Sequence, residues 1–147
     1  MSIYKNTTYS EIYELVLALL SSYKIDDIYI KEGEYGIETF FMPYLKIASG
    51  ELENKAGIDL SDRNDILKEF NSKLSDGQQL IVAKYIMIGY LSKETHDIMQ
   101  MQLHLQDGDF KTYAEKNNLD GKLNALYMLK EEAGYDIKRS GYNGFNW

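Results

Sequence analysis

Residues 76–92, DGQQLIVAKYIMIGYLS, decide the fold of this chain. Ser75 comes directly before them and can cap a helix, and Asp76 in the first turn favours the positive end of the helix dipole. From Leu80 onward the stretch is apolar on nearly every side, and a helix of that kind is buried among other elements. The stretch therefore predicts the central helix of a mainly α protein.

The segment N-terminal to this stretch predicts a first helix over about residues 9–23. Thr8 and Glu11 have the spacing of a capping box, in which each side chain satisfies a free backbone N–H of the first turn. The apolar residues that follow recur at helical spacing and form one stripe, which predicts a core-facing helix. The stripe comprises Ile12, Leu15, Val16, Leu19 and Leu20.

A polar link through Asp26 and Asp27 leads to a second predicted helix, over about residues 35–52. The residues predicted to form its buried side are Phe40, Phe41, Tyr44, Leu45 and Ala48. Pro43 has no N–H to donate, so it either opens this helix at its first position or kinks it. Residues 58–75 keep no helical period, which indicates a loop or a short hairpin, with a short helix near residues 66–70 as the alternative.

Two further helices are expected after the central one, over about residues 93–105 and 110–134. The acidic turn Asp107-Gly108-Asp109 should end the first of them. The face of the last helix is predicted from Tyr113, Leu119, Leu123, Leu126, Tyr127 and Lys130. The sequence thus predicts a compact bundle of about four to five helices, with a loop or short hairpin before the central helix and an extended C-terminal arm.

The expected domain organisation is one helical domain over residues 1–134, followed by an arm over residues 135–147. This arm spaces four aromatic residues with glycines, a composition that should not continue a helix readily. Aromatic residues are common interface anchors, so the arm either packs on its own domain or docks on another chain. The candidate partner-binding residues are Tyr135, Tyr142, Phe145 and Trp147.

Composition restricts the possible function classes. The 147 residues suit one domain, and 44% hydrophobic residues can form a core. No apolar run approaches the roughly 18 residues of a membrane helix, so no membrane association is expected. The absence of cysteine removes thiol nucleophiles and disulfides. A net charge of -7 and only two arginines, Arg63 and Arg139, disfavour binding to nucleic-acid phosphates.

No pattern in the sequence predicts catalysis, a cofactor or a metal site. His96 and His104 stand roughly 12 Å apart along one predicted helix, too far to share a metal. Asp59, Asp62 and Asp65 lack the spacing of a calcium loop and fit a solvated acidic turn. Phosphate-binding and nucleophile-elbow motifs do not occur. We expect a protein that is not an enzyme, although acids distant in sequence could still converge in space.

Three segments of the chain carry motifs of a known kind. In residues 59–91, DLSDRNDILKEFNSKLSDGQQLIVAKYIMIGYL, an acidic D-L-S-D-R-[DN]-D loop and F-N-x-x-L precede an apolar helix, and this order resembles a segment of small neck proteins of tailed bacteriophages. DFKTYAEKNNL at residues 109–119 resembles the opening of the last long helix in that family, and YLKIA at 44–48 resembles an early element. Gln78-Gln79 and Tyr90 stand where such relatives often carry Glu-Glu and Trp.

The resemblance implies a structural virion protein, a head–tail connector (adaptor) made in the bacterial host cytoplasm and located in the neck. It would form a homo-oligomeric, dodecameric ring between the portal protein and the tail or other neck proteins. DNA would pass through an acidic lumen without specific binding. Two alternatives stay open: another neck or tail-completion protein of the same particle, and an acidic inhibitor that mimics the charge of DNA.

Overall fold

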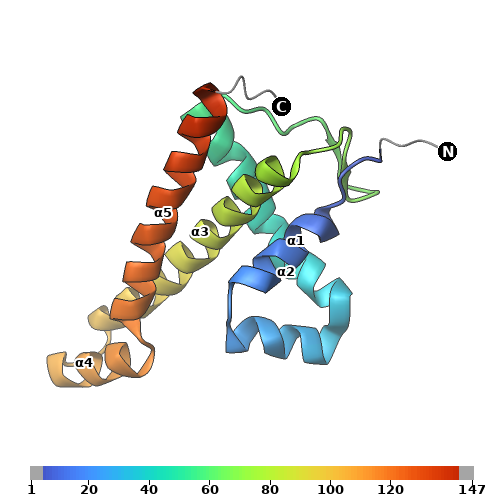
Figure 1. Ribbon diagram of the computed structural model, residues 1–147. Coiled ribbons are helices and arrows are strands. Elements are labelled where there is room, and N and C mark those ends of the chain that lie inside the picture. The colour runs from blue at the N-terminus through green and yellow to red at the C-terminus, as the bar shows by residue number, and fades with distance from the viewer. Residues whose placement is uncertain (1–4, 143–147) are drawn as a thin grey trace.

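The computed structural model describes residues 5–142, with their side chains as far as residue 139, and it confirms the mainly helical fold class (Figure 1). The helices are α1 (Tyr9–Leu19), α2 (Tyr23–Ala56), α3 (Asp76–Gln100), α4 (Asp107–Lys116) and α5 (Leu119–Tyr142), with a 3-10 turn, η1 (Met101–Leu103), after α3. Two short strands, β1 (Arg63–Asn64) and β2 (Glu69–Phe70), lie between α2 and α3.

Helix α3 is the central element, as its apolar composition predicts. It packs against α1, α2 and α5, and Val82 and Ile86 on it are fully buried. The predicted start of α3 is also confirmed. The Ser75 hydroxyl accepts from the N–H of Gln78, and the Ser75 N–H donates to the side-chain oxygen of Gln78. α3 therefore forms the wall on which the other long helices pack.

The boundary predicted after residue 92 is wrong, because α3 continues without a break to Gln100. No glycine or proline interrupts residues 93–100, and Lys93 pairs with Asp97 one turn later at 2.8 Å. The acidic turn Asp107-Gly108-Asp109 was predicted to end a helix, yet it forms the first turn of α4. Carboxylates at this end of a helix face the positive end of its dipole, which explains the correction.

The single helix predicted over residues 110–134 is divided into α4 and α5. The chain turns at Asn118, which has a φ of 54°, a left-handed conformation that asparagine tolerates better than most residues. Gly121 fits against this turn, since a Cβ there would lie 2.5 Å from Nδ2 of Asn118. α5 buries Leu126, Leu129 and Ala133. Tyr127 and Lys130, predicted on its packing face, are exposed.

The predicted start of the extended arm is also wrong. α5 continues through Tyr135 and ends at Tyr142, so the glycines at 134 and 141 lie within helix. Arg139 pairs with Asp136 at 2.9 Å, one helical turn earlier, and stabilises this extension. The boundary expected between residues 134 and 135 therefore falls inside α5. Phe145 and Trp147 lie outside the described residues.

Helix α1 ends at Leu19 instead of continuing to about residue 23, and its predicted capping box is present. α2 begins earlier than predicted, so Asp26 and Asp27 are helical. The break within α2 is at Gly33 (φ 67°, ψ -154°) and not at Pro43, whose fixed φ is compatible with a helix. Gly33 thus divides α2 into a first limb, residues 23–32, and a second limb, residues 34–56. Figure 1 shows the chain turning sharply between these two limbs.

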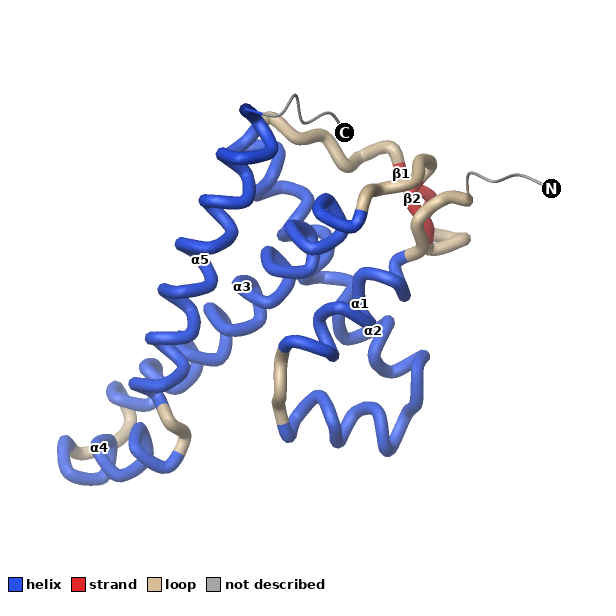
Figure 2. Tube along the Cα trace, viewed as in Figure 1, coloured by secondary structure: helices blue, strands red, loops and turns tan. Residues whose placement is uncertain are grey.

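The short hairpin predicted as one possibility before α3 is confirmed. β1 and β2 are antiparallel, with Arg63 opposite Phe70 (Figure 2). The N-terminal chain runs beside them: the Phe70 N–H donates to the Thr7 carbonyl at 2.8 Å, and Thr8 forms an isolated bridge with Glu69. Phe70 is buried against Tyr9, with ring centroids 5.2 Å apart. These contacts fix the hairpin to the start of α1.

Candidate functional site

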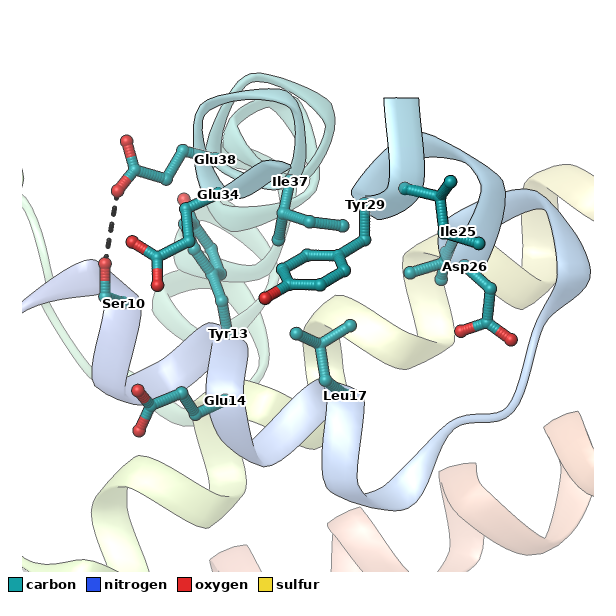
Figure 3. Close-up of a pocket in the computed structure, with 11 residues that line it drawn as sticks. Ser10, Tyr13, Glu14, Leu17, Ile25, Asp26, Tyr29, Glu34, Ile37 and Glu38 are labelled. Carbon is teal, nitrogen blue, oxygen red and sulfur yellow. Dashed lines mark hydrogen bonds between the residues drawn. The ribbon is translucent and has the colours of Figure 1, made fainter. Parts of the chain in front are cut away.

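A groove of about 560 Å³ lies between α1 and the two limbs of α2, and we call it the α1–α2 groove (Figure 3). Its apolar lining is Tyr13, Leu17, Ile25, Tyr29, Ile30 and Ile37. In Figure 3 the ring of Tyr29 points into the space between Leu17 and Ile37. Side chains from all three helical segments therefore meet around one hollow.

The local sequence explains why α1 and the two limbs of α2 leave this groove between them. Ile25 and Ile37 are buried, one on each limb of α2, and they attach the two limbs to the core. Gly33 between them adopts a conformation that is essentially restricted to glycine, so the limbs can meet at a sharp angle. The Ser22 and Tyr90 hydroxyls are 2.8 Å apart, which ties the beginning of α2 to the central helix.

The first limb of α2 exposes an unusual amount of apolar surface. Tyr23 is 95% exposed and Ile30 is 80% exposed, while Tyr29 retains 53% of its surface at the edge of the groove. Scattered exposed apolar residues are normal, but a group beside a groove is typical of a surface that binds another molecule. This limb is the strongest candidate for a binding surface among the described residues.

Four carboxylates surround the apolar centre of the α1–α2 groove, and no lysine or arginine lines it. Glu38 accepts from the Ser10 hydroxyl at 3.2 Å and from Lys68 Nζ at 2.6 Å. The carboxylates of Glu14, Asp26 and Glu34 make no ion pair with any described residue. The groove therefore combines an apolar interior with a negative rim, which attracts a basic and apolar ligand.

The hairpin presents a second apolar surface at its tip. Ile66 is 92% exposed and Leu67 is 65% exposed. Asn64 holds the tip in shape, because its side-chain oxygen accepts from the N–H groups of both residues at 2.9 Å. Because hydrogen bonds fix the backbone, these two side chains are presented at low entropic cost to a partner.

Asp65 joins this hairpin to α1. The Tyr9 hydroxyl donates to Asp65 Oδ1 at 2.6 Å, and Arg63 Nε lies 3.2 Å from the same oxygen. The hydrogen bond from Tyr9, together with the charge of Arg63, holds the pKa of Asp65 below its usual value. Burial and this hydrogen bond in turn raise the pKa of Tyr9. Asp65 therefore has a structural role in positioning the tip.

Of the four candidate residues of the C-terminal region, Tyr135 is the one whose side chain the structure describes. Tyr135 is 64% exposed on α5, on the same helix as the exposed Tyr127 and Met128. Tyr142 is the last residue of α5, and its side chain is not described. Phe145 and Trp147 lie outside the described residues. Tyr135 therefore belongs to a helix face and not to a separate arm.

The histidines and the acidic loop occupy ordinary positions. Both histidines are exposed, and His96 Nε2 lies 3.3 Å from the Gln100 amide nitrogen. Asp59 accepts from the Ser61 N–H at 2.8 Å, the turn that its position predicted. Within residues 5–142, no three histidine or acidic side chains are grouped as metal ligands would be. No helix in this range has the length and apolar composition to cross a membrane.

Comparison of the chain with protein-family models, with curated proteins and with solved structures gives no significant match. The function is therefore inferred from the residues and from the geometry described above.

Sequence reasoning missed the α1–α2 groove because it treated the region around Asp26 and Asp27 as a polar link. Two signals were present. Tyr29 and Ile30 are large apolar residues in a stretch otherwise rich in charge, and Gly33 can break a helix. Read together, they indicate a short helical limb with its own apolar side.

Proposed function

We propose that this chain is a head–tail connector subunit of a tailed bacteriophage, located in the neck between the portal and the tail or the next neck ring. The observation that carries the proposal is the resemblance of three segments, in the expected order along the chain, to neck proteins of tailed bacteriophages. Residues 59–75 form the hairpin that leads into α3, and residues 109–119 cover most of α4 and reach the first residue of α5. Two of the three segments thus include connections between helices, while the third, residues 44–48, lies within α2.

The proposed activity is assembly, in which no covalent bond is made or broken. A connector needs exposed, well-positioned apolar groups, and the hairpin tip offers Ile66 and Leu67 on a hydrogen-bonded turn. It also needs a lumen to which DNA does not adhere. A ring of subunits that each carry -7 repels the DNA phosphates, so DNA can pass without specific binding.

The portal, other neck or tail proteins and further copies of the chain are the proposed partners. Tyr135 on α5, with Tyr142, Phe145 and Trp147 beyond it, remains the proposed contact region for the portal or a neighbouring subunit. Aromatic anchors of this kind commonly carry much of the binding energy of an interface.

The proposal is tested by ending the chain after Tyr142 in the phage that encodes it. All described helices lie before that point, so the shortened protein should keep its circular dichroism spectrum and melting temperature. It should be absent from purified particles, whereas the full chain should co-purify with the portal. A full chain that is missing from particles refutes the connector function. A shortened chain that assembles normally refutes the role of the C-terminal aromatics.

A charge mimic of DNA is the second candidate, favoured by the carboxylates of Glu14, Asp26 and Glu34 on one side of the molecule. Such an inhibitor would bind a basic nuclease as a monomer or a dimer. Inhibition of a restriction nuclease by the purified chain, lost on reversal of these three charges, would favour this function over the connector.

A further inference from the structure

We infer that the α1–α2 groove receives the C-terminal segment of a second copy of this chain. The C-terminal segment is defined as residues 138–147, KRSGYNGFNW, of which the first five residues complete α5. The closed ring that this contact would form rests on the proposed function. The contact between two copies does not, because it can be measured on the purified protein.

Charge complementarity is the first reason. The rim of the groove holds three carboxylates without ion-pair partners among the described residues, Glu14, Asp26 and Glu34. The C-terminal segment begins with Lys138 and Arg139 and contains no acidic side chain. Lys138 forms no ion pair within the described part of the chain. The Arg139 side chain is 70% exposed, and its partner Asp136 also pairs with Lys84, so Arg139 can exchange partners without leaving Asp136 unpaired.

The apolar parts also match. The interior of the groove is formed by isoleucine, leucine and tyrosine side chains. The C-terminal segment carries Tyr142, Phe145 and Trp147, separated by residues that include glycine. A volume of about 560 Å³ lies within the roughly 300–1,000 Å³ of cavities that enclose small ligands, so it can accept an aromatic side chain. Basic residues followed by aromatics therefore meet a negative rim followed by an apolar interior.

The occupant must come from another copy because of where α5 ends. Figure 1 shows the last turn of α5 and the frame formed by α1 and the first limb of α2 at opposite ends of the molecule. The five residues after Tyr142 reach at most about 17 Å when fully extended. A neighbouring copy can bring its C-terminal end to the groove without this limit.

The positions of the two surfaces define the assembly. A groove at one end and a complementary segment at the other give a head-to-tail contact between identical chains. Contacts of this type close into a ring when the rotation between copies allows it, and otherwise form an open filament. The contact thus gives a physical origin for the ring in the proposed function.

The test is sedimentation of the full chain over a range of concentrations at low and high salt. The wild type should self-associate, more weakly at high salt because the rim charges are screened. Reversal of two rim charges, Glu14→Lys with Glu34→Lys, should weaken association about 30-fold, the factor expected for loss of interface anchors. Glu53→Lys with Glu115→Lys changes two exposed carboxylates elsewhere by the same charge and should leave association unchanged.

A charge exchange makes the test specific. Lys138→Glu with Arg139→Glu should weaken association as the groove reversal does, and the two reversals combined in one chain should restore it. For the apolar part, Tyr29→Ser should weaken association, while Tyr127→Ser, at a residue of similar exposure, should not. Circular dichroism establishes that each variant is folded.

Three results overturn the inference: a wild type that stays monomeric at every concentration, association that the groove reversal leaves intact, or a combined variant that does not recover. These results leave the connector function standing if the chain still co-purifies with the portal. If the chain self-associates through the groove but is absent from particles, the connector function is refuted and the inferred contact between copies stands.

Discussion

The ion pair between Lys84 on α3 and Asp136 on α5 gives the most direct test of how the last helix is held. Lys84 Nζ lies 2.6 Å from Asp136 Oδ2, and the two side chains are only 13% and 15% exposed. Glu132 lies farther from the same ammonium group, at 3.8 Å. The pair thus bridges two long helices in a location that water reaches poorly.

We predict that Asp136→Ala destabilises the protein by about 2–3 kcal/mol. Removal of one partner from a buried pair commonly costs roughly 3–5 kcal/mol, because the other charge is left without compensation. Glu132 remains near Lys84 and some water reaches the site, so the lower value applies. For a chain of this size, that loss lowers the melting temperature by roughly 5–10 °C.

Two further variants make the measurement decisive. Asp97→Ala breaks the Lys93–Asp97 pair, which has a similar length, 2.8 Å, but side chains that are 57% and 55% exposed. Its loss should destabilise the protein far less than the loss of Asp136, because both charges stay in water. Lys84→Met combined with Asp136→Leu removes both charges and should recover most of the stability. Urea denaturation followed by circular dichroism gives each value. Equal losses in Asp136→Ala and Asp97→Ala, or a double variant as unstable as Asp136→Ala, would refute the reasoning.

Three further predictions concern stability and are measured by urea denaturation. Ile81→Asp should unfold the domain, because Ile81 is 2% exposed and a buried carboxylate costs several kcal/mol out of a total of roughly 5–15; a folded variant would contradict the placement of α3. Gly33→Ala should cost about 1–3 kcal/mol, since φ is positive there, whereas Gly50→Ala, in open helix interior, should stabilise by about 0.5–1 kcal/mol. Because the pKa of Asp65 is lowered in the fold from its ordinary 3.8, its contribution is present above that pH and is lost as pH falls below it. Asp65→Asn should therefore lose less stability than the wild type between pH 5 and pH 2, and equal losses would exclude a role for the Tyr9–Asp65 hydrogen bond.

Local signals in the sequence predicted the parts of the fold that depend on neighbouring residues. The capping box predicted at Thr8 and the cap predicted at Ser75 place the starts of α1 and α3, because each cap is made within four consecutive residues. Residues 80–91 are apolar apart from Lys84 and Gly89, and this composition identified α3 as the central helix, because a helix packed on most sides has no broad polar face.

The errors lie where two local preferences compete and tertiary packing decides between them. Asp107 and Asp109 suit a turn, but they also suit the first turn of a helix, and α4 uses the second property. Gly134 and Gly141 suggested the end of a helix, yet the Lys84–Asp136 pair and the buried Ala133 hold α5 against α3 through this region. Contacts with a helix far away in sequence outweigh the weak propensity of a single glycine.

The groove shows most clearly why the binding surface could not be read from sequence. Its apolar side chains come from α1 and from both limbs of α2, so no single segment contains the whole lining. Tyr29 and Ile30 signal an apolar side of the first limb, but they do not show which segments stand opposite it. The surface exists because Gly33 sets the angle between the limbs, while Ile25 and Ile37 anchor them. One backbone angle thus converts three ordinary helical faces into a hollow. A substitution at Gly33 that changes this angle should therefore weaken self-association, while the core around α3 stays folded.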